Sequence, residues 1–161
     1  MQAILDDILV LTALPWQVAL TRLFGALVLS GLVGLEREAR HRPAGLRTHM
    51  LVGLASALYC LIMLEVVATT DVYSDRVASD PLRLIEAVTG GVAFLAAGMI
   101  IVSGGKVKGL TTGAGLWLVA AIGLSVGFGY WLLAGATTVL ALLVFRMIKL
   151  AENKAHFGGG D

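Results

Sequence analysis

The segment GLEREARHRPAGLRTHM, residues 34–50, places acidic side chains inside a basic cluster. Its charged and polar residues of interest are Glu36, Arg37, Glu38, Arg40, Arg42, Arg47, Thr48 and His49. Carboxylates pair with guanidinium groups one helical turn away, and they also bind hard cations such as Mg²⁺. Because acids weaken the simple electrostatic anchoring that arginines give, we interpret the segment as a specific polar network around Glu36.

The expected partners of Glu36 are Arg40, one turn further along the same helix, and Arg47 or His49 at the start of the next apolar segment. A network of Glu36, Arg47 and His49 would fix the first two apolar segments to each other. A plainer interpretation is a charged hairpin held by surface ion pairs, each worth about 0–1 kcal/mol. The sequence leaves both interpretations open.

Four further charged residues lie within or beside apolar segments, namely Arg22, Asp80, Arg83 and Glu86. A bare charge inside a bilayer is costly, so we expect Arg22 to meet Asp80 or Glu86. Asp80 also precedes Pro81, and this pair is typical of a helix N-cap followed by the first helical position. Glu86 falls roughly two turns into its segment, so it must be protonated, paired with an arginine or exposed to water.

No pattern in the sequence is typical of an enzyme site. There is no nucleophile elbow and no dinucleotide fingerprint, and the three histidines are not spaced as zinc ligands. SGGKVKGLTT, residues 103–112, superficially resembles a phosphate-binding loop, but it lacks the upstream glycine, and Lys106 is followed by Val107. We therefore predict a protein without enzymatic activity and without a cofactor.

The composition predicts a membrane protein. Hydrophobic residues make up 58% of the 161 residues and charged residues only 14%, whereas ordinary soluble domains have about 25% charged residues. The mean hydropathy is +0.88. Because so little polar surface cannot cover a water-soluble fold, we predict an all-α polytopic membrane protein that forms a single domain over residues 1–161. The net charge of +1 argues against a nucleic-acid partner.

Five apolar segments approach the roughly 20 residues that a membrane helix needs. The predicted spans are about 17–35, 46–69, 82–102, 110–126 and 129–149. The boundary between the last two is soft because only three residues separate them. Residues 3–14 predict a short amphipathic helix on the membrane surface, ended by Pro15, with Trp16 at the interface.

Basic residues alternate between the two ends of this arrangement. Nine of the twelve lie in or beside the loops and span ends that share one side: Arg37, Arg40, Arg42, Arg47, Lys106, Lys108, Arg146, Lys149 and Lys154. The positive-inside rule then predicts an external N-terminus and a cytoplasmic C-terminus. An odd number of spans agrees with this, because it places the two ends on opposite sides.

Most of the twenty glycines lie inside the predicted spans. Small residues let helix backbones approach closely, which holds helices together in lipid. The predicted packing positions are Gly31, Gly34, Gly90, Gly91 and Gly98. Residues 88–98 would present a smooth face of small residues, which either packs within the bundle or receives a partner helix. We also predict a homo-oligomer, with a dimer favoured.

Three motifs in order along the chain resemble the MgtC/SapB family. RLFGALVLSGLVGLEREARHRPAGLRTHMLVGLASALY, residues 22–59, is similar to the signature half of the family. DPLRLIEAVTGGVAFLAAGMI, residues 80–100, resembles its Asp-Pro-x-Arg segment and Gly-rich run. GLTTGAGLWLVAAIGLSVGFGYW, residues 109–131, resembles its Gly-Leu-Thr-Thr segment. We expect a short form of the family, without the soluble C-terminal domain that many members carry.

The resemblance implies a bacterial inner-membrane protein linked to magnesium limitation, with Mg²⁺ as a transported or sensed ion and a membrane partner such as the rotary ATP synthase. The polar positions that it implies are Glu36, Arg37, Glu38, Arg47, Thr48, His49, Asp80, Arg83, Thr111 and Thr112. The chain departs from the family at Ala93 and Ala96, where glycines are usual, and at Glu86, where a small or polar residue is usual.

Two classes of function are consistent with these observations. The favoured class is a non-enzymatic regulator of ion homeostasis that docks on a partner through its small-residue faces. The alternative is a cation transporter or channel in which Glu36, Asp80 and Glu86 line a path, although these residues do not form one evident site.

Overall fold

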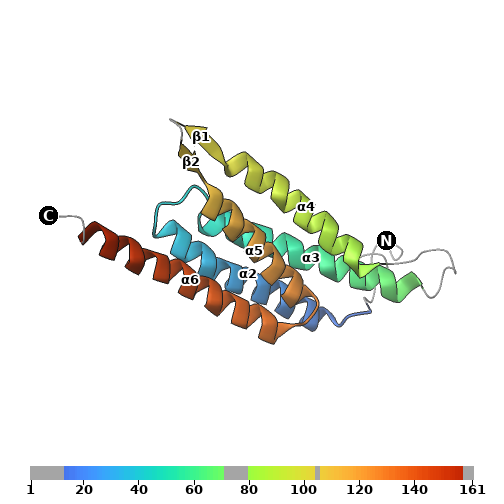
Figure 1. The fold of residues 1–161 in the computed structure, drawn as a ribbon. Coiled ribbons are helices and arrows are strands. Elements are labelled where there is room, and N and C mark those ends of the chain that lie inside the picture. Colours follow the sequence, from blue (N-terminus) through green and yellow to red (C-terminus); the bar gives the residue numbers. More distant parts are fainter. Residues whose placement is uncertain (1–12, 71–79, 104–105, 158–161) are drawn as a thin grey trace.

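The computed structural model describes residues 13–70, 80–103 and 106–157. Its elements are α2 (Trp16–Glu38), α3 (Leu46–Thr70), α4 (Pro81–Met99), β1 (Ile101–Ser103), β2 (Lys106–Lys108), α5 (Leu110–Gly127) and α6 (Trp131–Phe157) (Figure 1). Helices α2 to α5 are long and apolar enough to cross a membrane, and α6 contains a shorter apolar stretch, Trp131–Met147. This architecture confirms the predicted all-α polytopic membrane fold.

Two boundaries differ from those predicted. The third span was expected to run to residue 102, but α4 ends at Met99, and Ile101–Ser103 pairs with Lys106–Lys108 in an antiparallel hairpin. The β-branched run from Ile100 to Val102 favours extended backbone, which explains the early end of the helix. The last helix begins at Trp131, after Gly129 takes a positive φ of 87°. The amphipathic helix predicted for residues 3–14 lies almost entirely outside the described residues.

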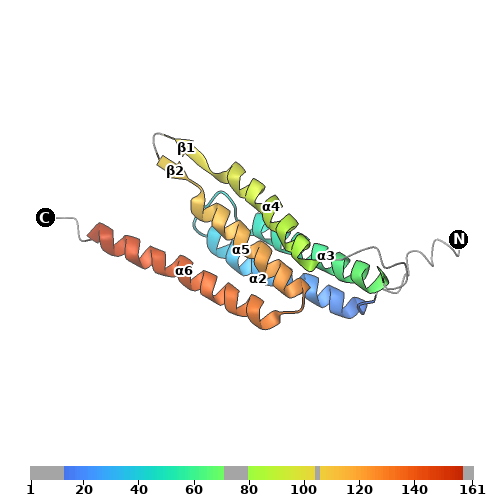
Figure 2. The same cartoon turned by 45° about the vertical axis from the view of Figure 1, so that its right-hand side comes forward.

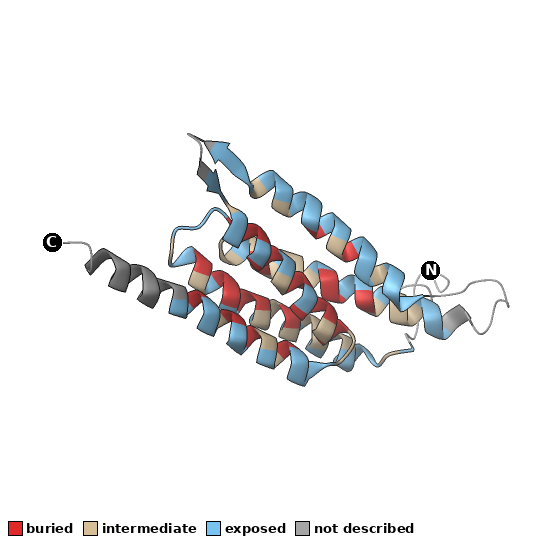
Figure 3. Cartoon of the chain, viewed as in Figure 1, coloured by how far each residue is buried: buried red, intermediate tan, exposed pale blue. Residues whose placement is uncertain are grey.

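Helix α5 forms the centre of the bundle. It packs against α2, α3, α4 and α6, whereas α4 and α6 lie on opposite sides of it (Figures 1 and 2). In α5, 61% of the apolar stretch is buried, whereas in α4 only 11% of it is buried (Figure 3). The described fold is therefore a core of α2, α3 and α5 with two peripheral helices, of which α4 exposes most of its surface.

Glycines permit the close contact between α3 and α5. A Cβ atom at Gly123 would clash with the backbone carbonyl of Gly53, and a Cβ atom at Gly127 would lie 2.7 Å from the Cβ atom of Cys60. Both positions lie on the buried face of α5. Because non-bonded atoms of a neighbouring helix do not approach a real Cβ atom that closely, only glycine lets these two helices pack at this separation.

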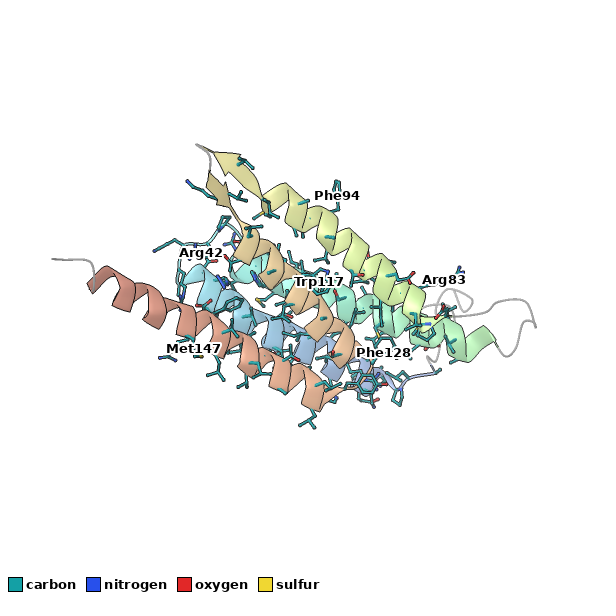
Figure 4. All side chains as sticks on the ribbon, viewed as in Figure 1. Arg42, Arg83, Phe94, Trp117, Phe128 and Met147 are labelled. Atoms are coloured by element: carbon teal, nitrogen blue, oxygen red, sulfur yellow. The ribbon has the colours of Figure 1, made fainter. Side chains whose placement is uncertain are left out.

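The basic segments lie together at one end of the bundle. The loop between α2 and α3, the β1–β2 hairpin and the end of α6 occupy this end, whereas the α5–α6 turn lies at the other (Figures 1 and 2). Arg42 marks the basic end and Arg83 lies toward the opposite one (Figure 4). The alternation of basic residues along the sequence therefore becomes a separation in space.

Gly123→Ala is expected to destabilise the protein by about 1–3 kcal/mol, because the added methyl group must push α3 away from α5. The measurement is the free energy of unfolding of purified protein in detergent micelles. Gly135→Ala on α6 is the matched control, since a Cβ atom there meets nothing within 4 Å. Equal stability of the two variants would show that α3 and α5 do not pack this closely.

Candidate functional site

A buried arginine is the centre of the polar cluster at the basic end. Arg37 lies in the last turn of α2 and is only 3% exposed. Its guanidinium carbon lies 3.5 Å above the ring centre of Phe145 from α6, and its Nε atom lies 3.4 Å from Oε2 of Glu36. The aromatic face and the neighbouring carboxylate thus stabilise a charge that is otherwise removed from water.

Glu36 pairs with Arg37 in α2 and with Arg40 in the turn that follows α2. Its second ion pair joins it to Arg40, one turn further along, as the sequence predicts. The other predicted partners, Arg47 and His49, form no ion pair with Glu36, so that part of the predicted network is wrong. Arg47 is exposed, and the Nδ1 atom of His49 lies 2.8 Å from the carbonyl oxygen of Gly45 in the preceding turn.

Glu38 supplies the polar link between α2 and α3 that sequence reasoning assigned to Glu36. Its Oε2 atom accepts a hydrogen bond of 3.0 Å from the backbone N–H of Leu46, at the first residue of α3. The first N–H groups of a helix have no partner within the helix, so this carboxylate acts as a cap. Gly45 makes room for it, because a Cβ atom there would clash with Oε2.

His49 is fully buried where α2, α3 and α5 meet. Gly34 lies against its Cβ atom, and a Cβ atom built at Gly115 would lie 3.3 Å from its Nε2 atom. That Nε2 atom is buried and has no hydrogen-bond partner among the residues that the structure describes. The histidine side chain therefore fits in a small space beside two glycines, and one of its ring nitrogens has no hydrogen-bond partner in the core of the described residues.

Arg22 does not meet Asp80 or Glu86, which corrects the sequence prediction. Its Nη1 atom donates a hydrogen bond of 2.8 Å to the carbonyl oxygen of Gly127, in the last turn of α5. The C-terminal carbonyls of a helix lack partners within the helix and carry partial negative charge, so they can replace a carboxylate. The arrangement decides the outcome, because α2 packs on α3, α5 and α6 rather than on the start of α4.

Asp80, Arg83 and Glu86 lie on or beside α4, apart from this cluster. Asp80 caps α4, because its Oδ1 atom accepts a hydrogen bond of 2.9 Å from the N–H of Leu82. Arg83 and Glu86 are exposed on α4 and form no ion pair with another described residue. Thr48 is half-buried, and Thr111 and Thr112 start α5.

The predicted packing glycines fall into two groups. Gly31 and Gly34 face α3. A Cβ atom added at Gly31 would lie 3.3 Å from the Met50 side chain, and one added at Gly34 would lie 2.8 Å from the backbone of Leu46. Built Cβ atoms at Gly90, Gly91 and Gly98 meet nothing within 4 Å, so α4 leaves these positions open in the single chain.

The residues that the structure describes contain no group of three His, Cys, Asp or Glu side chains that could hold a metal ion. Glu36 lies at the basic end of the bundle, whereas Asp80 precedes the first residue of α4, toward the opposite end (Figure 1).

Sequence reasoning missed the role of Phe145, because an aromatic residue inside an apolar span carries no sign of the charge that it will contact.

A model of the MgtC family matches residues 23–154. The chain belongs to the MgtC family. The match begins within α2 and extends through the larger part of α6, so the buried Arg37–His49 cluster lies inside the family region.

Curated relatives of this MgtC-family chain come from several bacteria. It is 41% identical over 127 residues to YhiD of Escherichia coli (strain K12), provisionally named a magnesium transporter, covering 78% of this chain and 58% of the relative. It is 39% identical over 129 residues to Protein MgtC of Brucella abortus (strain 2308), covering 79% and 50%. The chain thus spans about half the length of these relatives. No solved structure matches it.

Phe145→Leu is expected to destabilise this MgtC-family protein by about 1–2 kcal/mol beyond the loss of apolar packing, because the Arg37 guanidinium loses the ring face above which it is buried. The measurement is the free energy of unfolding in micelles. Phe94→Leu is the matched control, since Phe94 is 85% exposed on α4. Both substitutions are then repeated in an Arg37→Met background. If Phe145→Leu still destabilises the protein more than Phe94→Leu by the same amount, the contact between the arginine and the ring is not the cause.

Proposed function

We propose that this chain is a non-enzymatic inner-membrane protein of magnesium homeostasis that regulates a membrane partner. The partner docks a transmembrane helix in the groove between α3 and α4. The observation that carries the proposal is the open groove itself, combined with a helix that leaves its small residues without neighbours.

The groove has a volume of about 460 Å³. Its lining residues are Val52, Ala55, Ser56 and Tyr59 from α3 and Leu84, Ala87, Val88, Gly91 and Val92 from α4. The Ser56 hydroxyl donates a hydrogen bond to the carbonyl oxygen of Val52, so its donor is already satisfied within α3. The groove therefore presents an apolar surface at the depth of the bilayer.

Small residues favour a helix over a lipid chain in this groove. Ala87 and Gly91 are four residues apart on α4, and Ala55 and Ser56 face them from α3. Such small-x-x-x-small spacing lets a third helix approach closely and gain dispersion contacts that a lipid chain gives less well.

The exposed carboxylate of Glu86 on α4 indicates which side chains the partner helix should carry. Glu86 lies next to Ala87, is exposed, and forms no ion pair with another described residue. A carboxylate at this place in a membrane helix is stabilised by a basic or hydrogen-bond-donating side chain. The occupant that fits best is thus an apolar helix with such a residue near the end of the bundle where α4 begins. The rotary ATP synthase, which the family resemblance implies, is the candidate partner, and a second copy of the chain is the competing occupant.

Transport of Mg²⁺ is the second candidate function, because the Escherichia coli relative carries a transporter's name. Magnesium sites use clustered oxygen ligands and retain several waters. Among the described residues, Glu36 is occupied by two arginines and Asp80 caps α4. This geometry supports docking more than it supports a route for ions.

Gly91→Leu is expected to abolish growth of cells that depend on this protein at low magnesium, because the side chain fills the groove. Gly90→Leu is the matched control: it lies on the same helix, also meets nothing within 4 Å, and does not line the groove. Growth is measured at equal protein levels in the membrane. Equal growth of the two variants would remove the groove from the function.

Purified protein in liposomes is expected to carry no magnesium flux. The flux is measured with a Mg²⁺-sensitive dye inside the liposomes, with Glu36→Gln alongside. Flux that disappears in Glu36→Gln would overturn the regulatory proposal and make the chain a transporter.

We also propose an external N-terminus and a cytoplasmic basic end, from the positive-inside rule. In a Cys60→Ser background, a membrane-impermeant maleimide is expected to label Tyr130→Cys on intact spheroplasts, because Tyr130 lies in the exposed α5–α6 turn. Arg42→Cys is expected to react only after permeabilisation. The reverse pattern would invert the orientation.

A further inference from the structure

A second cavity, of about 510 Å³, lies at the basic end of the bundle and has a different character from the groove. Arg40, His41 and Arg42 line it from the α2–α3 loop, and Lys108, Thr111 and Thr112 line it from β2 and the start of α5. No acidic residue lines it. We call it the basic pocket.

The positive charge in the basic pocket is not neutralised within the described chain. Arg40 pairs with Glu36, but Arg42 and Lys108 form no ion pair with a described residue. They come from segments more than sixty residues apart, as the sequence shows, so the fold itself brings them together. Two free cations that face one cavity without an acid favour an anionic ligand.

The loop that carries Arg42 is held in place by its backbone. The N–H of Arg42 donates to the carbonyl oxygen of Arg37 at 3.2 Å, and the N–H of His41 donates to that of Glu38 at 3.0 Å. His41 has a φ of 51°, in the left-handed region that non-glycine residues rarely adopt. These bonds fix the backbone of the loop as a tight turn after α2, which places Arg42 beside the pocket.

Helix α5 points its first turn at the same cavity. Gly109 caps the helix without a side-chain hydrogen bond, which leaves N–H groups of the first turn free to bind a ligand. Gly109 has a φ of 90°, and a Cβ atom there would clash with the carbonyl oxygen of Met99. Free N–H groups and the helix dipole together favour an anion at this position.

Thr112 provides an observation that is independent of charge. Its side chain lines the basic pocket although the residue is only 2% exposed. Its hydroxyl makes no hydrogen bond to any residue that the structure describes. An unpartnered hydroxyl on a residue that is otherwise buried, and that lines the cavity, is available to donate a hydrogen bond to a ligand there.

We propose that the basic pocket binds a phosphate group at the membrane surface, held by Arg42, Lys108, the Thr112 hydroxyl and the first N–H groups of α5. The pocket lies beside the C-terminal end of α2 and the N-terminal end of α5. With the basic end at the membrane surface, this is the depth at which lipid headgroups carry their phosphates. An anionic phospholipid and free phosphate share this chemistry. The site is independent of partner docking in the groove, because the two cavities share no lining residue.

The site differs from the phosphate-binding loop that residues 103–112 superficially resemble. A P-loop wraps one glycine-rich segment around the phosphate, whereas here the arginine comes from a distant loop. Sequence spacing therefore excluded the motif correctly but could not exclude the pocket.

Binding is tested with the full chain in nanodiscs. Native mass spectrometry counts phosphatidylglycerol bound to protein from mixed phosphatidylcholine discs, and ³¹P NMR titration measures inorganic phosphate bound in pure phosphatidylcholine discs. The double variant Arg42→Gln/Lys108→Gln is expected to weaken binding about tenfold or more, because it removes both free cations. Arg47→Gln/Arg146→Gln is the matched control, since it removes the same charge from exposed residues that do not line the pocket.

A charge-neutral variant separates specific binding from general attraction. Thr112→Val keeps the charge and nearly the shape of the pocket, and it is expected to weaken phosphate binding severalfold because a hydrogen-bond donor is lost. Thr89→Val, which changes a hydroxyl on α4 outside the pocket, is expected to bind as the unchanged protein does.

The outcomes decide both the proposal and the source of the phosphate. Binding of phosphatidylglycerol alone identifies a lipid headgroup site, and binding of inorganic phosphate in neutral discs identifies a site for the free ion. Equal weakening by the two double variants, no effect of Thr112→Val, or no binding in either arm would overturn the proposal. None of these results depends on growth at low magnesium, so the docking proposal is judged separately.

Discussion

The close approach of α3 and α5 is the constraint on which the rest of the described structure depends. Gly123 and Gly53 meet backbone to backbone, at a separation that no Cβ atom tolerates. In lipid this contact has no hydrophobic drive, so dispersion between closely packed backbones must hold it. Once α5 is fixed there, its start lies beside the α2–α3 loop, its middle touches His49, and its last carbonyls reach Arg22.

Two arginines of α2 are stabilised without a carboxylate from another helix. Arg37 uses an aromatic face and an adjacent carboxylate, and Arg22 uses the carbonyl end of a helix. Removing a charge from water is costly, so such partners are required wherever the bundle closes around a charge. Helix α4 differs because Arg83 and Glu86 stay exposed. This contrast supports a role for α4 in contacts outside the chain.

Two surfaces with different physics follow from this arrangement. The groove between α3 and α4 is apolar and lined by small residues, so it suits a helix inside the bilayer. The basic pocket lies at the basic end of the bundle and gathers cations, helix N–H groups and an unpartnered hydroxyl, so it suits a phosphate group. The two proposals therefore assign a partner helix to the groove and a phosphate group to the basic pocket.

The sequence by itself determined the features that depend on neighbours in the chain. Apolar length predicted the spans, Asp80 before Pro81 predicted the cap of α4, and the spacing of Glu36 and Arg40 predicted their ion pair. Only the tertiary structure decided the partner of Arg22, the cap that Glu38 provides, the unpartnered nitrogen of His49 and the basic pocket. Helices α3 and α5 are apolar on all sides, so no stripe in the sequence marks their buried faces. Their rotation and register, and hence every contact between distant residues, are set by where glycines let the backbones meet.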